Sequence, residues 1–140
     1  MKKILVLISI AAFMSCKPTS EKQLTPSANQ KEFVWEGANI YFLLTDRFQN
    51  ADPSNDHNFN RTDDAATLRG FQGGDLKGIT QKIKEGYFTQ LGINAIWLTP
   101  IVEQIHAGTD EGTGKSYGYH GYWTKDWTAI DPNFGTKEDL

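Results

Sequence analysis

Beyond its first thirty or so residues, the chain contains two short, almost entirely apolar runs separated by a long, largely polar stretch. The runs are Ile40–Leu44 and Ile93–Leu98. Apolar residues at nearly every position are typical of strands that are covered on both faces of a parallel sheet. We therefore predict two buried parallel strands.

A helix is predicted between the two strands, over residues 76–91. Apolar residues recur at every fourth position and so fall on one face of a helix: Ile79, Ile83, Tyr87 and Leu91. Asp75 stands where an N-cap residue belongs, and Gly92 has the C-terminal capping position. The order strand, helix, strand predicts a parallel βαβ unit with a right-handed crossover, and hence an α/β fold.

The connection between the first strand and the helix is unusually long. It runs to about 30 residues, whereas such loops usually have about 2–6. Long loops at the carboxyl ends of parallel strands are where α/β barrels carry their sites. Near the other end of the sequence, Thr136 and Asp139 have the spacing of a capping box that opens a new helix. One helical turn is not stable by itself, so we expect the chain to be an amino-terminal fragment of a larger protein.

The first thirty or so residues have the composition of a targeting segment and a tether. Two lysines precede the apolar stretch Ile4–Met14, which is too short to span a membrane and is typical of a secretory signal. Cys16, the only cysteine, follows at a position that resembles a lipoprotein cleavage site, with cleavage near residues 9–11 as the alternative. We predict a signal peptide over 1–15, a polar tether over 16–34 and the start of a catalytic barrel over 35–140.

The charge balance narrows the choice of partners. The formal net charge is −3 at pH 7, and the sequence has no basic run. Such a chain is not expected to bind nucleic acid or to be held electrostatically at a membrane surface. The expected contact with a membrane is through a lipid anchor only, on an exported protein of the periplasm, the outer membrane or the cell surface.

Four motifs, in this order and spacing, resemble the opening of the α-amylases of glycoside hydrolase family 13. They are NIYFLLTDRF (39–48), GGDLKGI (73–79), LGINAIWLTP (91–100) and YHGYW (119–123). Within the family, residues 49–56 and 103–106 are most similar to periplasmic α-amylases of bacterial maltodextrin systems, with cyclodextrin glycosyltransferases as relatives. The resemblance covers residues 35–140. It implies the amino-terminal part of a (β/α)8 TIM barrel and cleavage of α-1,4-glucosidic bonds in starch or maltodextrin.

The run at 119–123 is a candidate sugar site. Flat rings can stack on the apolar face of a pyranose while their polar tips bind its hydroxyls, although an aromatic corner of the core is the alternative. The resemblance assigns Tyr122 to stacking on the sugar, His120 to its hydroxyls and Trp123 to the lining of the pocket. Tyr119 is expected to be structural, and Trp97, within a strand, to lie in the core.

The long loop is a candidate calcium site, since calcium takes six to eight hard oxygens. Its spacing is not that of an EF-hand. By resemblance to the cyclodextrin glycosyltransferases, the ligands are Asn50, Asp52, Asn55, Asp56, Gly73 through its carbonyl, and Asp75. The alternative is a solvated loop of Asx-turns. His57 is expected to face solvent, because calcium prefers oxygen.

The carboxylates that such a reaction needs are not expected within residues 1–140. A glycosidase requires one nucleophilic or basic carboxylate and one acid. In the family these follow later strands, and Asp46 and Asp126 belong to framework motifs. The alternatives to an α-amylase are a transglycosylase on the same scaffold and a non-catalytic glucan-binding lipoprotein.

Overall fold

The computed structural model describes residues 33–62 and 64–140. The predicted signal peptide, Cys16 and nearly all of the tether lie outside the described residues. Within the described part, no helix is long and apolar enough to cross a membrane. The elements described below all belong to the unit Val34–Leu140.

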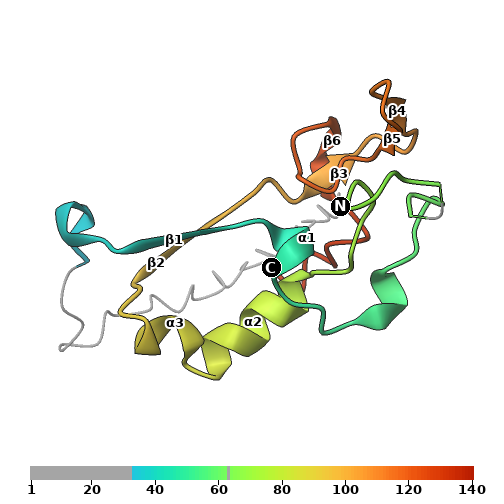
Figure 1. The fold of residues 1–140 in the computed structure, drawn as a ribbon. Coiled ribbons are helices and arrows are strands. Elements are labelled where there is room, and N and C mark those ends of the chain that lie inside the picture. The colour runs from blue at the N-terminus through green and yellow to red at the C-terminus, as the bar shows by residue number, and fades with distance from the viewer. Residues whose placement is uncertain (1–32, 63) are drawn as a thin grey trace, which may run out of the picture. The chain divides into compact units, whose positions relative to one another are not determined.

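Two short parallel strands run side by side in this unit (Figure 1). Strand β1, Ile40–Leu43, pairs in register with β2, Ala95–Leu98. Helices α2, Leu76–Lys84, and α3, Tyr87–Gln90, follow one another alongside this pair. A core cluster of Leu43, Leu76, Ile79 and Phe88 joins the helices to the strands. The predicted parallel strand–helix–strand unit is therefore confirmed.

The single helix predicted over 76–91 is wrong, because the chain breaks it at Gly86. This glycine has a left-handed φ of +76°, which costs a residue without a Cβ little. Phe88, after the break, is buried in the core. Ile83 before the break and Leu91 after it are 52% and 54% exposed. The fourfold apolar repeat thus does not mark the buried face beyond the first two turns.

The expectation that both strands are covered on both faces is also wrong within the described residues. Ile40 and Phe42 of β1 and Trp97 of β2 are 50%, 57% and 61% exposed. Trp97 packs edge-on against Phe42, with ring centroids 5.7 Å apart, instead of lying in the core. The helices cover only the face that carries Leu43, so the opposite face of this strand pair is an open aromatic surface.

The predicted caps are present. The Asp75 carboxylate accepts the Gly78 N–H at 2.6 Å and caps α2. Gly92 has a φ of +73° and its N–H donates to the Thr89 carbonyl. At 136–139 the Asp139 carboxylate accepts both the N–H and the hydroxyl of Thr136, but these residues form a turn rather than a helix.

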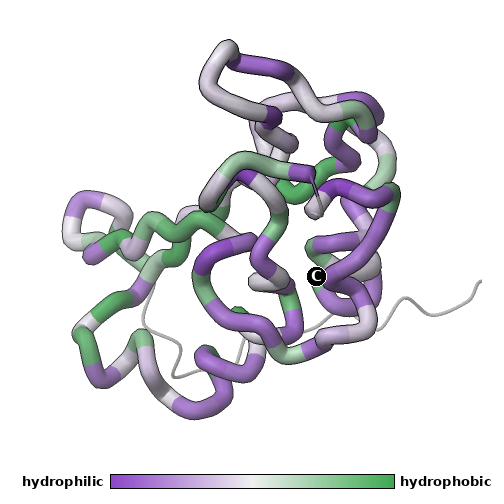
Figure 2. The backbone as a smooth tube through the Cα atoms, turned by 45° about the vertical axis from the view of Figure 1, so that its right-hand side comes forward, coloured by the Kyte–Doolittle hydropathy of each residue, from purple (hydrophilic) through white to green (hydrophobic). Residues whose placement is uncertain are grey.

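A 3-10 turn, η1 (Trp35–Gly37), precedes β1. The other elements follow the carboxyl ends of β1 and β2: α1 (Thr45–Phe48), η2 (Pro53–Asn55), β3 (Val102–Gln104), β4 (Thr109–Asp110), β5 (Lys115–Ser116) and β6 (Thr124–Ile130). β3 pairs antiparallel with β6, and β4 with β5. In Figure 2 hydrophobic stretches follow the strand pair, whereas the surrounding loops are mostly hydrophilic. The long loops after both strands therefore meet at one end of the sheet.

Candidate functional site

The aromatic loop (residues 118–123) is held against the end of β2 by a close backbone contact. Gly121 has a φ of +89°, and a Cβ at this position would overlap the Pro100 carbonyl. The Gly121 N–H donates to the Gly118 carbonyl at 3.0 Å and closes a turn. Only glycine satisfies both conditions, so the backbone places the neighbouring aromatic side chains beside the strand end.

The rings of the aromatic loop are ordered around His120. Its imidazole stacks with the Tyr122 ring at 5.9 Å and 19°, and meets the Trp123 ring edge-on at 4.9 Å. The Tyr122 N–H donates to His120 Nδ1 at 3.0 Å, so the neutral imidazole carries its proton on Nε2. Tyr122 is 60% exposed. An accessible flat ring beside an imidazole donor is an arrangement that can hold a sugar ring.

Tyr119 meets the His120 ring edge-on, with ring centroids 5.3 Å apart, and a cation covers one face of its own ring. The Arg47 guanidinium carbon lies 3.9 Å from the centre of the Tyr119 ring. Arg47 Nη2 in turn donates to the carbonyls of Leu68 and Gly70 at 2.7 and 3.0 Å. These contacts support the structural role that the sequence predicts for Tyr119.

A small cavity of about 100 Å³ adjoins His120. Its lining joins the aromatic loop to two neighbouring segments: Arg69, Glu111, Ser116, Tyr119, His120 and Trp123. Glu111 accepts the Ser116 hydroxyl at 2.5 Å. Burial lowers the pKa of His120 below its ordinary value, and the Glu111 carboxylate partly opposes this shift. Sequence analysis did not find Arg69 or Glu111, because charged residues in polar loops are usually solvated.

The oxygen-rich loop (residues 50–56) folds back on itself. Asn50 Nδ2 donates to both carboxylate oxygens of Asp56, at 2.8 and 2.9 Å. Gly73, with a φ of +89°, lies so close that a Cβ would overlap the side chains of Asn50 and Asp56. The side-chain oxygens of Asn50 and Asn55 are buried without a hydrogen-bond partner. Buried oxygens in that state are costly unless a cation or water satisfies them.

Asp75 and Asp52, two other expected ligands, also have protein partners. Asp75 Oδ2 accepts the N–H groups of Ala51 and Asp52 at 3.0 and 2.8 Å, so it fixes the oxygen-rich loop as well as capping α2. The Lys77 ammonium bonds to the Asp52 carboxylate and, with Ser54, lowers the pKa of Asp52 to about 2. His57 is exposed, as predicted, with Nδ1 at 3.3 Å from the Thr62 hydroxyl.

Residues 33–62 and 64–140 bring together no group of three or more His, Cys, Asp or Glu side chains that could hold a metal ion. The oxygen-rich loop differs from such a group, because its free oxygens belong to amides. A set of amide, carboxylate and carbonyl oxygens suits a hard cation such as calcium and does not suit a transition metal.

The two carboxylates that sequence analysis considered and set aside have structural contacts. Asp46 is 1% exposed and accepts the N–H groups of Gln72 and Gly73, which ties α1 to the segment before α2. Asp126 accepts the N–H and hydroxyl of Thr128, both at 2.7 Å. Both contacts are of the kind that a framework residue makes.

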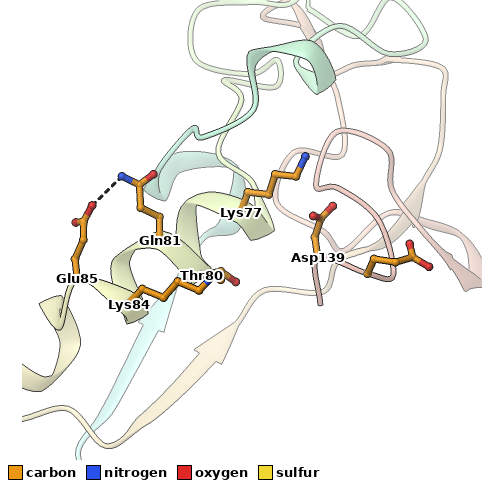
Figure 3. Close-up of a pocket in the computed structure, with 7 residues that line it drawn as sticks. Lys77, Thr80, Gln81, Lys84, Glu85 and Asp139 are labelled. Carbon is orange, nitrogen blue, oxygen red and sulfur yellow. Dashed lines mark hydrogen bonds between the residues drawn. The ribbon is translucent and has the colours of Figure 1, made fainter.

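A hollow of about 550 Å³ lies between α2 and the turn 136–139 (Figure 3), and Lys77 on its wall also bonds to Asp52 of the oxygen-rich loop. Its lining is charged or polar: Lys77, Thr80, Gln81, Lys84, Glu85, Glu138 and Asp139. The side-chain amide of Gln81 donates a hydrogen bond to the Glu85 carboxylate, four residues further along the chain. None of these lining residues is apolar or aromatic, unlike most of the residues that line a small-molecule site, so we do not count the hollow as part of the site.

Comparison with known proteins identifies the class to which this fold and site belong. Residues 42–140 match the family "Alpha amylase, catalytic domain". The chain therefore belongs to the α-amylase family, glycoside hydrolase family 13, and its strands and helices are part of a (β/α)8 barrel. The predicted family and fold are confirmed.

Individual relatives agree with this assignment. A periplasmic α-amylase of Escherichia coli is 48% identical over an alignment of 112 positions that covers 77% of this chain and 16% of that protein. A cyclomaltodextrin glucanotransferase of Klebsiella oxytoca is 42% identical over 72% of this chain and 15% of its own length. The crystal structure of an Anoxybacillus α-amylase superposes with a TM-score of 0.60 at 37% identity, covering 77% of this chain and 20% of that one. The chain thus spans about a sixth of the length of these curated relatives.

Proposed function

We propose that this chain supplies the first part of an exported glycoside hydrolase that cleaves α-1,4-glucosidic bonds of starch or maltodextrin. We refer to that longer protein as the complete enzyme. Support comes from membership of the α-amylase family and from relatives named as α-amylases, one of them periplasmic. The observation that carries the proposal is the exposed Tyr122 ring, stacked beside His120 at the end of β2.

In this proposal each residue of the aromatic loop has a separate role. The Tyr122 ring stacks on the apolar face of the glucose at the bond to be cut. His120, whose Nδ1 already accepts the Tyr122 N–H, uses its Nε2 proton to bind that glucose's hydroxyls. Trp123 lines the pocket. A lowered pKa keeps His120 neutral near pH 7. Only the neutral ring can accept at Nδ1 while it donates from Nε2.

The residues described here bind and orient the substrate and do not perform the chemistry. Asp46 holds backbone N–H groups in a buried position, and Asp126 closes a local turn. We propose that the carboxylate nucleophile and the acid/base are supplied by other parts of the complete enzyme. The aromatic loop would then hold the sugar for groups presented from later strands.

We also propose that the oxygen-rich loop holds a calcium ion. The ligands would be Asn50, Asp52, Asn55, Asp56, the Gly73 carbonyl and Asp75. The two buried amide oxygens without partners support this, because a bound cation would satisfy both. Calcium would supply positive charge that fixes the loop; it takes no part in bond cleavage.

For the amino-terminal region we keep the division predicted above as a proposal: a signal peptide over 1–15, lipidation at Cys16 and a tether over 16–34. Because its composition is polar, the tether would be a flexible coil that keeps the barrel a short distance from a bilayer. A palmitate-labelling experiment on the expressed protein would test it. Labelling that persists in a Cys16→Ala variant would contradict lipidation at this residue.

A transglycosylase is the second candidate, because two similar proteins are cyclomaltodextrin glucanotransferases. One is the Klebsiella oxytoca protein at 42% identity, and the other is a solved structure at 38% identity. The complete enzyme, incubated with soluble starch, separates the possibilities. We expect new reducing ends and linear maltodextrins. Cyclic products would favour the transglycosylase. Binding of starch without any product would favour a non-catalytic glucan-binding lipoprotein, and the absence of both would contradict the proposed function.

A further inference from the structure

Gln104, the last residue of β3, is a fully buried amide with both ends hydrogen-bonded. Its Oε1 accepts the Trp123 N–H at 2.7 Å, and its Nε2 donates to the Val102 carbonyl at 2.7 Å. Turning the amide over would place a donor against the Trp123 N–H and an acceptor against the Val102 carbonyl. The surroundings therefore impose one orientation on the side chain.

Gln104 contacts both ends of the aromatic loop. At one end it accepts the Trp123 N–H. At the other end Gly118 packs directly on it: a Cβ on Gly118 would lie 2.9 Å from Gln104 Cβ and 3.1 Å from Oε1. His120 and Tyr122 are carried by the backbone between these two contacts. The shape of the aromatic loop thus depends on the Gln104 side chain, which lies outside the loop.

A buried ion pair supports Gln104 from behind. The Gln104 N–H donates to Asp131 Oδ2 at 2.9 Å, and the same carboxylate binds the Arg61 guanidinium. Arg61, Asp131 and Gln104 all have 0% exposure. Asn133, which also bonds to Arg61, donates from its amide to the Asp56 carbonyl at 2.7 Å. Hydrogen bonds therefore lead without interruption from the oxygen-rich loop to the backbone of Trp123.

We infer that Gln104 is a positioning residue for glucan binding. It fixes the Trp123 N–H and the Gly118 backbone, and so keeps Tyr122 exposed beside His120. Because no part of Gln104 reaches solvent, it acts through the aromatic loop and does not touch the sugar. The inference rests on the proposed role of this loop in the complete enzyme.

The test compares two substitutions in the complete enzyme. Gln104→Leu removes both hydrogen bonds at similar volume. Gln104→Glu is compared with the unsubstituted enzyme at the same pH of 5, because binding itself depends on pH. It retains an acceptor and, as the protonated acid that a buried site facing a carbonyl favours, a donor. The readouts are amide hydrogen exchange of residues 118–123 and the Kd for maltoheptaose. We expect Gln104→Leu to speed exchange and weaken binding about tenfold each, and Gln104→Glu to stay within about threefold of the unsubstituted enzyme.

A core control separates positioning from general loss of stability. Ile79→Ala removes buried volume from the cluster beneath β1, away from the aromatic loop. It should leave both readouts unchanged below its melting temperature. Unchanged exchange and affinity in folded Gln104→Leu, or equal damage in Gln104→Glu or Ile79→Ala, would overturn the inference. Failure of the unsubstituted enzyme to bind maltoheptaose would instead overturn the proposed function.

Discussion

Arg61 and Asp131 form a bidentate ion pair with no exposed surface, although 70 positions separate them. The two contacts are Nη1 to Oδ2 at 2.8 Å and Nη2 to Oδ1 at 2.5 Å. The guanidinium carbon also lies 4.2 Å from the centre of the Phe71 ring. The pair joins the long connection after β1 to the turn after β6, so it sets how the two loop regions meet.

Removing one partner of this pair should be strongly destabilising. Arg61→Met in the complete enzyme leaves the Asp131 carboxylate buried without its cation, and should lower the free energy of unfolding by about 3–5 kcal/mol. Arg69→Met is the matched control, since Arg69 pairs with Glu111 at 3.4 Å in a partly exposed position and should cost less than about 1 kcal/mol. Urea unfolding measures both. Similar losses for the two variants would contradict the importance of the buried pair.

The calcium proposal names Asn55 as its most selective probe. Its buried side-chain oxygen has no hydrogen-bond partner, so Asn55→Ala removes a proposed ligand without breaking a bond seen in the structure. Calcium should raise the melting temperature of the complete enzyme, because an ion that binds only the folded state stabilises it. In Asn55→Ala most of that rise should disappear, with little change in the calcium-free melting temperature.

Asn94→Ala serves as the control for that experiment. Asn94 bonds to Asn39 at the opposite end of the strand pair, so its loss should leave the calcium response intact. A full response in Asn55→Ala would place any bound calcium elsewhere in the enzyme.

Truncation of Tyr122 distinguishes a sugar platform from a core aromatic. Tyr122→Ala should lower kcat/KM on maltodextrin about ten- to a hundredfold, whereas Tyr122→Phe keeps the stacking face and should cost much less. Because Tyr122 is 60% exposed, the melting temperature should change little. Full activity of the folded Ala variant would exclude the platform role, and a severe loss of stability would indicate a core residue instead.

Glucan binding should weaken on the acid side. Burial lowers the pKa of His120 from its ordinary value of 6.5. Protonation of Nδ1 would break its bond to the Tyr122 N–H. Affinity, and the stability that this neutral histidine contributes, should therefore be complete above pH 6.5 and decline as pH falls through the lowered pKa.

The affinity for maltoheptaose, measured as a function of pH, checks this. His120→Gln should remove the acid decline together with some affinity, while His57→Gln, at an exposed position, should retain it. A decline that persists unchanged in His120→Gln would assign it to another group.

Residues 34–140 expressed by themselves should not unfold cooperatively. The strand face formed by Ile40, Phe42 and Trp97 is half exposed or more, and a two-stranded sheet with one covered face is only marginally stable. Thermal melting followed by circular dichroism should give a broad transition. A sharp transition from a monomer would show that this unit is stable without further protein packed on the exposed strand face.

Local signals predicted much of the fold, whereas long-range contacts escaped prediction. The cap at Asp75 and the pairing of β1 with β2 follow from short patterns that the structure confirms. The break at Gly86 did not follow, because an isolated glycine is compatible with a helix and only packing decides which way Phe88 turns. The motifs named the aromatic and oxygen-rich residues of the candidate site but not Arg69 or Glu111. The support from Gln104 could not be predicted either, since its partner Asp131 lies 27 positions away.

The contact between Gly121 and Pro100 makes the backbone of the aromatic loop intolerant of change, and the rings beside this glycine carry the proposed sugar contacts. Even Ala at 121 would push the loop off the strand end. Within the described residues, variants with altered preference for sugar size are therefore better sought at the cavity wall formed by Glu111 and Arg69 than in the aromatic loop itself. A library at those two positions should leave Gly121 unchanged.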